Sequence, residues 1–385
     1  MSPALHDPLH DFPAQPLPPW RRAVLKVGSS LLAGFADAPG LDARHARGLA
    51  QFVQAARAAG RELVLVSSGA VAAGRARLAA AGDALVLRQA LAALGQAQLI
   101  GFWQGLLDAP VAQVLLSHDD LRDRRRYLNA RATLRELLAM RALPVINEND
   151  TVAVDELKLG DNDNLAAAVA TLVDADLLLI ATDVGGLYSA DPARDAGAVP
   201  QPRIARVTPA RLDAAGSAGS IGTGGMRSKL EAAAKAAAGG IATALFCGRD
   251  ARVVDALARD TLHGTRVDAA TDALPARKQW LRHAPAPGRI VVDAGAAAAL
   301  RTRGASLLPG GVRAAEGAFR RGDVVEVAEA GARPLARGLA QYGSDEVRRI
   351  AGRRSGEIES VLGFRYGEAV IHRDDLVLLE PGETP

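Results

Sequence analysis

Short apolar runs alternate with longer helical patterns along most of the chain, and this alternation limits the fold more than any other feature. Residues 23–27, 62–67 and 143–146 have the length and composition of buried strands. Residues 42–59 have the length of a helix and are followed by Gly60. Strands that alternate with helices form a mostly parallel sheet covered on both faces. The sequence therefore predicts an α/β fold.

This pattern changes after about residue 275. Helical patterns become rare apart from 344–351, and short apolar runs stand between Gly-rich turns at 289–293, 324–327, 335–339 and 369–372. Pro285 and Pro287 mark the expected linker, and a small β-rich domain is predicted beyond it. The expected organisation is a flexible N-terminal tail at 1–20, an α/β domain at 21–275, a linker at 276–287 and a β-rich domain at 288–380.

Composition excludes several classes of protein. The net charge is only +3 over 385 residues, whereas a nucleic-acid-binding protein usually concentrates more positive charge. The single cysteine, Cys247, excludes an intrachain disulfide and a multi-cysteine zinc site. The longest uncharged stretch, 89–107, contains several Gln and Gly residues, which favours a buried helix over a membrane span. We expect a soluble, cytoplasmic protein.

A lysine stands near the end of the first predicted strand, in the segment Lys26-Val27-Gly28-Ser29-Ser30. The chain has only 5 lysines among its 46 basic residues, so a lysine here indicates that a compact ammonium group is needed. Side chains at the carboxyl ends of strands face the crevice where α/β sheets bind ligands. Gly28 permits close approach to the backbone, and Ser29 can donate to a phosphate oxygen. An ordinary turn remains an alternative, because the full P-loop spacing is missing.

Three further polar segments have the chemistry to bind a small molecule. Segments 67–70 and 147–150 each follow or end a predicted strand, and 160–164 opens a predicted helix. Free N–H groups at a helix start bind carboxylates, while amide and carboxylate side chains can hold an ammonium group. Capping explains part of 160–164, because Asp and Asn are good N-caps. Its spacing does not match a calcium loop.

Consecutive glycines precede a second lysine in segment 223–229, at the start of an alanine-rich helix. The glycines expose N–H donors for a phosphate, and Lys229 lies one turn into the helix. Segment 182–188 adds another loop at a strand end. Two lysines on separate Gly-rich loops suit phosphoryl transfer. One ammonium group can neutralise the phosphate oxygens of ATP, and the other can lie between the phosphoryl donor and the acceptor as charge develops.

In this order, the motifs closely resemble the amino acid kinase family. The segments that carry the resemblance are LKVGSSLL, LVSSGAVAAGR, NARATLRELL, PVINENDTVAV, GDNDNLAA, TDVGGLYSADP and GTGGMRSKLEAA. The C-terminal segments SLLPGGVRAAEGAFRRGDVV and RRIAGRRSGEIESVLGF resemble the PUA module. The resemblance covers roughly residues 22–380. It implies a three-layer α/β kinase fold with a mostly parallel central sheet and a PUA-like C-terminal domain.

The resemblance also implies roles for individual residues. Lys26 and Lys229 would be catalytic and stabilise the transferring phosphoryl group, and Asp163 would hold both lysines in place. The residues around the acceptor would be Ser68, Gly69, Asn147, Asp150 and Asn162. The ATP-binding residues would be Lys26, Gly28, Ser29, Thr182, Asp183, Thr223, Gly224, Gly225, Met226, Arg227, Ser228 and Lys229.

The branch of the family that fits best phosphorylates the γ-carboxylate of free L-glutamate, the first step of proline biosynthesis. The resemblance implies ATP and Mg²⁺ as cofactors, with the protein ligands of Mg²⁺ unassigned. It also implies inhibition by L-proline and a homo-oligomer, either a dimer or a tetramer. Acetylglutamate, aspartate or a nucleoside monophosphate are alternative acceptors. RNA binding through the PUA-like domain is a further alternative, although acids nearly balance arginines there.

Overall fold

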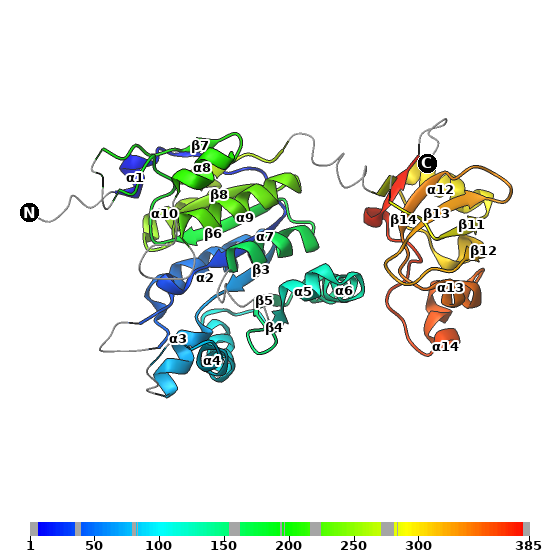
Figure 1. The fold of residues 1–385 in the computed structure, drawn as a ribbon, viewed down its shortest axis with the longest axis horizontal. Helices are drawn as coiled ribbons and strands as arrows, with labels where there is room; N and C mark the ends of the chain where they lie inside the picture. Colours follow the sequence, from blue (N-terminus) through cyan, green and yellow to red (C-terminus); the bar gives the residue numbers. More distant parts are fainter. Residues whose placement is uncertain are drawn as a thin grey trace, which may run out of the picture. The chain divides into compact units, whose positions relative to one another are not determined.

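In the computed structural model, the described residues are 7–34, 40–78, 82, 84–153, 162–192, 195, 197–215, 225–270, 281–282 and 284–379. The chain divides into two compact units (Figure 1). The first unit contains residues 1–122 and 133–273, and the second contains residues 123–132 and 274–385. The first unit is α/β and the second is built on a smaller sheet, so the predicted fold class is confirmed.

An eight-stranded sheet, in the order β4-β5-β3-β2-β6-β8-β10-β7, forms the centre of the first unit. The first six strands in this order, β4, β5, β3, β2, β6 and β8, are parallel to their neighbours. Strand β10 is antiparallel to β8, and β7 is parallel to β10. Their bounds are β2 Arg22–Val27, β3 Glu62–Ser67, β4 Val111–Leu116, β5 Leu143–Glu148, β6 Leu177–Thr182, β7 Arg203–Ile204, β8 Ala242–Cys247 and β10 Gly264–Val267. The central strands are mostly apolar because both faces of the sheet are covered.

Helices cover the two faces of this sheet in separate groups. Ala23, Leu25 and Val27 of β2 belong to a core that also contains residues of α2, α4 and α10. The alternate residues of β2, including Lys26, face the other side, where α7 packs with α9. The helices are α2 Ala43–Ala58, α3 Ala70–Arg77, α4 Leu85–Leu106, α5 His118–Arg122, α6 Arg124–Ala139, α7 Asn162–Leu172, α8 Pro209–Ala214, α9 Met226–Ala238 and α10 Ala251–Leu257.

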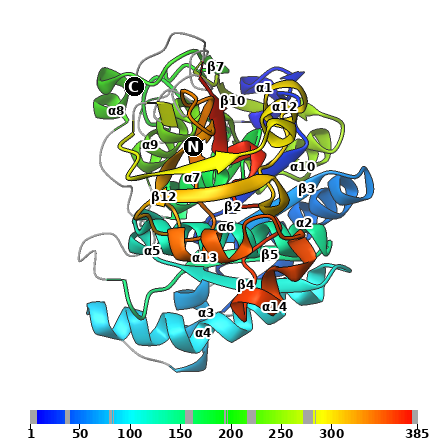
Figure 2. The same cartoon turned by 90° about the vertical axis from the view of Figure 1, so that its right-hand side faces the viewer.

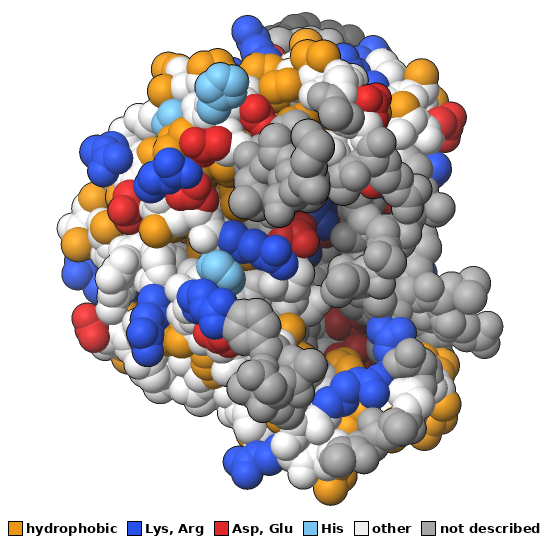
Figure 3. Space-filling model, turned by 90° about the vertical axis from the view of Figure 1, so that its left-hand side faces the viewer, with side chains coloured by type: hydrophobic (Ala, Val, Ile, Leu, Met, Phe, Trp, Pro, Cys, Tyr) orange, Lys and Arg blue, Asp and Glu red, His pale blue; other side chains and the backbone are white. Residues whose placement is uncertain are grey.

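The surface mixes both signs of charge. On the face drawn in Figure 3, Lys and Arg side chains stand next to Asp and Glu side chains. Ion pairs of the first unit include Arg61 with Asp260 at 2.6 Å and Arg252 with Asp250 at 2.6 Å. Because exposed ion pairs contribute only about 0–1 kcal/mol each, the stability of the unit must come mainly from its apolar core.

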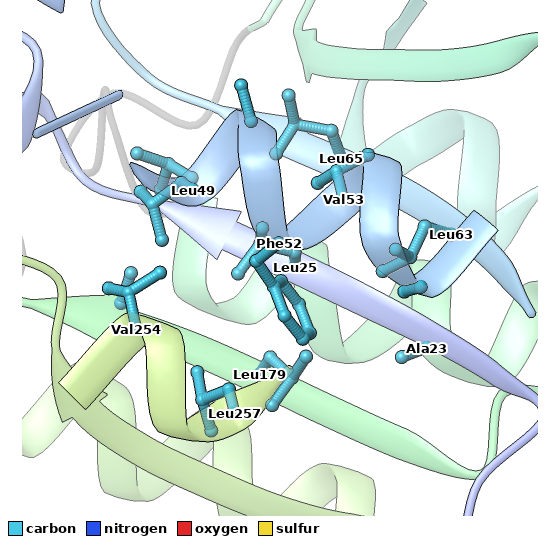
Figure 4. Packing of buried hydrophobic residues seen from close by; sticks show 14 of the residues in the cluster. Ala23, Leu25, Leu49, Phe52, Val53, Leu63, Leu65, Leu179, Val254 and Leu257 are labelled. Carbon is cyan, nitrogen blue, oxygen red and sulfur yellow. The ribbon is translucent and has the colours of Figure 1, made fainter. Parts of the chain in front are cut away.

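The core positions β2 and therefore the lysine near its end. Phe52 and Val53 of α2, Leu25 of β2 and Leu257 of α10 belong to one cluster of buried side chains, in which Phe52 lies beside Leu25 (Figure 4). These four side chains are each no more than 2% exposed. Full burial of such a side chain contributes roughly 1.5–3 kcal/mol relative to exposure. The strand that carries Lys26 is thus held on its apolar face by several independent contacts.

Helices α3 and α4 pack closely through two glycines. A Cβ atom at Gly74 would lie 2.0 Å from the carbonyl oxygen of Leu91, and one at Gly95 would lie 1.9 Å from that of Ala70. Any larger side chain would therefore push the helices apart. By length and composition alone, α4 could cross a membrane. Leu99, however, is buried in the core of the first unit, as expected for a helix that packs within a folded domain.

Residues 7–20 are not the flexible tail that the sequence predicts. Helix α1 (Pro8–Asp11) leads into Phe12, whose ring is fully buried and meets Tyr188 edge-on at 5.2 Å. Strand β1 (Gln15–Pro16) then pairs with β9 (Thr261–Leu262). The prediction fails because the partners of this segment lie far away in the sequence. Residues 1–6 lie outside the described part of the chain.

The second unit has a five-stranded sheet in the order β12-β11-β13-β14-β15. Its strands are β11 Gly288–Val292, β12 Val312–Gly317, β13 Val324–Glu329, β14 Ala336–Leu339 and β15 Leu376–Leu378. Its helices are α12 Ala294–Arg303, α13 Ser344–Ile350 and α14 Ile358–Leu362. Within this unit the strands lie between α12 on one side and α13 with α14 on the other (Figure 2). Ile290, Val325 and Tyr342 belong to its own apolar core.

Some elements of the second unit differ from the expectation. Helix α12 was not predicted, because its sequence AGAAAALRTR lacks the apolar periodicity of an amphipathic helix. Residues 369–372 do not form a strand and make only an isolated bridge between Leu307 and Ile371. The strands β12 and β15 were also missed, since their few inward-facing residues give a weak signal.

A buried ion pair lies inside the second unit. Arg131, from the part of α6 that belongs to this unit, contacts the carboxylate of Asp375. Arg131 is 2% exposed and Asp375 is 1% exposed. The pair therefore brings one positive and one negative charge together away from water.

Candidate active site

A cavity of about 340 Å³ lies at the carboxyl edge of the sheet in the first unit. Parallel strands β2, β3, β5 and β6 end at this edge, so the segments that follow them meet there. The volume is within the range of small-molecule sites, roughly 300–1,000 Å³. The predicted site residues that line the cavity are Lys26, Gly28, Ser29, Ser68, Gly69, Asn147, Asp150, Asn162, Thr182, Asp183 and Lys229.

Two lysines and one aspartate form a buried cluster at this cavity. The Nζ of Lys26 lies 2.6 Å from one carboxylate oxygen of Asp163, and the Nζ of Lys229 lies 3.3 Å from the other. Ser228 Oγ donates to Asp163 at 2.7 Å. Asp163 is only 1% exposed because it stands in the first turn of α7, between β2 and α9. The aspartate thus holds together two lysines that are far apart in the sequence.

The cluster carries an excess of positive charge. Burial alone would raise the pKa of Asp163, but the charges of Lys26 and Lys229 overcome that effect and lower the pKa to about 2. Burial lowers the pKa of Lys229, and Asp163 opposes this shift. Asp163 is therefore ionised at neutral pH and matches only one of the two ammonium groups. A buried site of this kind favours an anionic ligand such as a phosphate.

Amide and hydroxyl groups line another part of the cavity. Asn162 Nδ2 donates to Ser68 Oγ at 2.8 Å and to Asn147 Oδ1 at 3.1 Å. Asn147 in turn donates to Gln96 Oε1 at 2.9 Å. Among the described residues, Asn162 Oδ1 has no hydrogen-bond partner although it is buried. Gly69 has φ of 116°, a conformation that favours glycine, and the helix α3 begins directly after it. The arrangement presents both donors and acceptors to a polar ligand.

Asp150 lies at the same cavity beside a cation. Burial raises the pKa of Asp150 to about 6, against the opposing charge of Arg88. Arg88 stands in the first turn of α4 and also lines the cavity. A carboxylate and a guanidinium group are thus placed together on the wall of the site.

The predicted nucleotide-binding residues are only partly gathered at the cavity. Gly28, Ser29, Thr182 and Asp183 line it. Met226 and Arg227 do not, and Arg227 instead pairs with Glu231 at 3.0 Å. Gly225 directly precedes α9, and Ser228 reaches the site through Asp163. Thr223 and Gly224 lie outside the described residues, as do Gly160 and Asp161 of the other polar motif.

The described residues offer no cluster of three acidic, histidine or cysteine side chains that could cage a metal ion. Mg²⁺ in kinases is commonly held by one or two carboxylates together with phosphate oxygens and water. Asp163 is already engaged by two lysines. Asp183 lines the cavity, its side chain is 42% exposed, and its partner Arg249 lies 3.6 Å away. The residues present therefore fit an ion that arrives with the nucleotide, with Asp183 as the candidate protein group.

Several residues of the site were not predicted from the motifs. Arg75, Arg88 and Glu148 line the cavity. Gln96 supports Asn147, and Trp103 Nε1 donates to Ser67 Oγ at 2.8 Å. Glu148 lies in the polar segment 147–150 and Arg75 ends the segment LVSSGAVAAGR, although neither was assigned a role, whereas Arg88, Gln96 and Trp103 belong to α4, where no motif marks them. Polar and charged positions within the otherwise apolar helix α4 were the only signal that could have found Arg88 and Gln96.

Known proteins share this sequence over most of its length. Residues 21–247 match the amino acid kinase family and residues 288–362 match the PUA domain. The glutamate 5-kinase of Xylella fastidiosa strain M23 is 62% identical over 377 residues, which cover 96% of this chain and 98% of that protein. The glutamate 5-kinase of Xanthomonas campestris pv. campestris strain 8004 is 66% identical over 364 residues, covering 92% of this chain and 100% of that protein. The resemblance inferred from the motifs is thereby confirmed.

Proposed function

Because this chain belongs to the amino acid kinase family and resembles glutamate 5-kinases over nearly its full length, we propose that it phosphorylates the γ-carboxylate of free L-glutamate with ATP. The product would be L-glutamyl 5-phosphate, the first intermediate on the way to proline. The observation that carries the proposal is the buried Lys26–Asp163–Lys229 cluster beside a cavity lined by amides and hydroxyls.

The reaction requires positioning and charge stabilisation rather than a covalent intermediate with the enzyme. An oxygen of the γ-carboxylate attacks the γ-phosphorus of ATP, the bond to the β–γ bridging oxygen breaks, and ADP leaves with the electron pair. Lys26 and Lys229 stabilise the negative charge on the phosphoryl oxygens during transfer. Asp163 is a positioning residue, because it fixes both ammonium groups. Mg²⁺ bound with the nucleotide would supply further neutralisation of the phosphates.

Ser68, Asn147 and Asn162 would surround the acceptor. The buried Asn162 Oδ1, which lacks a partner among the described residues, can accept a hydrogen bond from the ammonium group of glutamate. Gly28, Ser29, Thr182 and the glycines before α9 would face ATP. Adjacent sites for an anionic phosphate and a zwitterionic amino acid match the two substrates of a glutamate kinase.

An acyl-phosphate product can be trapped chemically. Hydroxylamine displaces phosphate from glutamyl phosphate and leaves γ-glutamyl hydroxamate, which is measured with ferric chloride. Wild-type protein with ATP, Mg²⁺ and glutamate should form hydroxamate, and Lys229→Ala should lose at least about 10²-fold in rate. Lys235→Ala, which removes a lysine from the same helix outside the cavity, is the matched control and should keep its rate. Hydroxamate formation that is equal in wild type and Lys229→Ala would contradict the assigned site.

A panel of acceptors distinguishes the remaining kinase functions. Acetylglutamate, aspartate and nucleoside monophosphates are each offered with ATP, and ADP release is followed by a coupled assay. Free glutamate should give the largest kcat/KM. A larger value for any other acceptor would overturn the proposed substrate while leaving the phosphotransferase chemistry in place.

Three further properties belong to the same proposal. L-Proline should inhibit at low glutamate, and an unchanged rate would refute this. A cytoplasmic homo-oligomer, either a dimer or a tetramer, is expected, and light scattering would measure its mass. Four arginines stand close together in the second unit, at positions 348, 349, 353 and 354. RNA binding by this unit is not favoured, because Arg348 pairs with Asp345 and Arg349 donates to the carbonyl oxygen of Val361. Salt-dependent retention of RNA would argue otherwise.

A further inference from the structure

The cavity contains two arginines in addition to the two lysines of the catalytic cluster. Arg75 lies in α3 and Arg88 in the first turn of α4, and both line the cavity. Arg75 donates to the carbonyl oxygen of Gly82 at 2.9 Å, in the connection between the two helices. Arg88 instead interacts with Asp150, which follows β5 at the substrate side. The two arginines therefore have different surroundings.

The charge pattern of glutamate requires a second cation in the site. Its γ-carboxylate must lie near Lys26 and Lys229 to receive the phosphoryl group. Its α-carboxylate is separated from the γ-carboxylate by three carbon atoms of the chain and cannot use the same lysines. A guanidinium group is well suited to a carboxylate, because its planar fork donates two parallel hydrogen bonds. An adjacent acidic group can bind the α-ammonium group.

We propose that Arg88 binds the α-carboxylate of the substrate and so selects acceptors with a free α-carboxylate, while the neighbouring Asp150 receives the α-ammonium group. This inference rests on the proposed glutamate kinase function and deepens it. Arg88 is thereby a specificity-determining residue of the acceptor pocket. Because it lies at the opposite end of the substrate from the transferred phosphoryl group, it contributes to binding more than to the chemical step.

The position of Arg88 is fixed by the packing of α4. The close contacts of Gly74 and Gly95 hold α4 against α3, which begins at the acceptor loop after Gly69. Gln96, two turns after Arg88 on the same helix, accepts a hydrogen bond from Asn147. One helix thus carries both the proposed carboxylate anchor and the support of an amide in the pocket. Such a rigid element can define the length of the acceptor.

The test compares acceptors that differ only at the α-carboxylate. Glutamate and its α-amide, isoglutamine, are assayed with wild-type protein, Arg88→Ala, Arg88→Lys and Arg77→Ala. Arg77 is exposed on α3 and outside the cavity, so its variant removes one positive charge from the same pair of helices without touching the site.

In Arg88→Ala, KM for glutamate should rise about 10- to 100-fold, the size expected for loss of a charged hydrogen bond. The kcat/KM for isoglutamine should change little, so the wild-type preference for glutamate should collapse. Arg88→Lys should restore part of that preference, KM for ATP should stay near wild type in every variant, and Arg77→Ala should behave as wild type.

Equal losses for glutamate and isoglutamine in Arg88→Ala would assign Arg88 a structural role and overturn the inference alone. An unchanged preference would overturn it as well. If the wild-type protein turns over ATP with another acceptor but not with glutamate, the proposed function fails first and the inference fails with it. The wild-type assay therefore distinguishes failure of the proposed function from failure of the inference about Arg88.

Discussion

Each unit of the molecule buries an ionic cluster, and the two clusters differ in their balance of charge. In the first unit, Asp163 faces two cations, Lys26 and Lys229. In the second unit, Asp375 contacts Arg131, and the nearby Arg124 interacts with Asp323 as well as with Asp375, so that two cations stand with two acids. The first cluster lies at a cavity and holds two lysines against one buried carboxylate, whereas the second is balanced and none of its residues lines that cavity.

This difference separates a ligand site from a structural contact on physical grounds. In a neutral buried pair, the cost of removing both charges from water is roughly offset by their attraction, so the pair needs no ligand. A buried cluster with more cations than carboxylates is less fully compensated, even though Asp183 also acts on Lys229 from the cavity wall. It is tolerated where a substrate supplies the missing charge, which is why strongly perturbed groups cluster at functional sites.

The largest effect is expected from Asp163→Asn, which breaks the unequal cluster. Two buried ammonium groups would then repel each other without a counterion, so the free energy of unfolding should fall by about 3–5 kcal/mol. The rate of hydroxamate formation should fall by about 10²- to 10³-fold, because both lysines lose their position. Urea unfolding, followed by the fluorescence of the buried Trp103, measures the change in the free energy of unfolding. The colorimetric hydroxamate assay measures the change in rate. A stable and active variant would show that the cluster is not organised by Asp163.

The neutral pair should respond differently. Arg131→Met removes the cation in direct contact with the buried Asp375, and the unfolding free energy should fall by about 3 kcal/mol or more. The double variant Arg131→Met, Asp375→Leu should recover most of that loss, because two apolar side chains can replace a neutral pair. Activity of the folded double variant should stay near wild type. Unfolding followed by circular dichroism measures the free energy of unfolding of both variants. A double variant as unstable as Arg131→Met would contradict a replaceable structural ion pair.

The smallest effect concerns two of the aspartates at the site, Asp163 and Asp150, which differ in pKa. Asp163, with a pKa of about 2, stays ionised across the working range, whereas Asp150 titrates near pH 6. If ionised Asp150 binds the ammonium group of glutamate, KM for glutamate should rise up to about tenfold per pH unit as the pH falls below 6.

Stability should change in the opposite direction. The native pKa of Asp150 is above its unfolded value, so the native state holds its proton more tightly and this group costs stability as the pH rises from about 4 to 6. Asp150→Asn is the control for both trends. The variant should have a high KM that no longer depends on pH in this range, and a retained pH dependence would assign the titration to another group.

Much of the site could be predicted from the sequence because its parts lie at strand ends. Lys26, Ser68 and Asn147 each stand within two residues of the end of a predicted strand, and parallel strands bring such positions to one edge. The lysine on α9 was found because glycines precede it. Each of these patterns lies within a short segment of the sequence. The fold class could be predicted as well, because short apolar runs and helical patterns alternate along the chain.

The remainder depends on contacts between distant segments. Arg88 lines the cavity and Gln96 supports Asn147 because two glycines allow α4 to approach α3, and the only signal within α4 is that these two positions are polar in an otherwise apolar helix. Phe12 is buried by residues more than 170 positions away, so the N-terminal segment looked disordered. Helix α12 was missed for a different reason, since a run of alanines shows no apolar face.

The glycines of α4 also matter for anyone who wishes to engineer a more heat-resistant protein. A methyl group at Gly95 would collide with the backbone of α3, whereas at Gly101 or Gly105 it would meet no atom within 4 Å. Alanine is favoured over glycine inside a helix by about 1 kcal/mol. The same exchange is thus a stabilising modification at Gly101 and Gly105 and a disruptive one at Gly95, which lies less than two turns before Gly101.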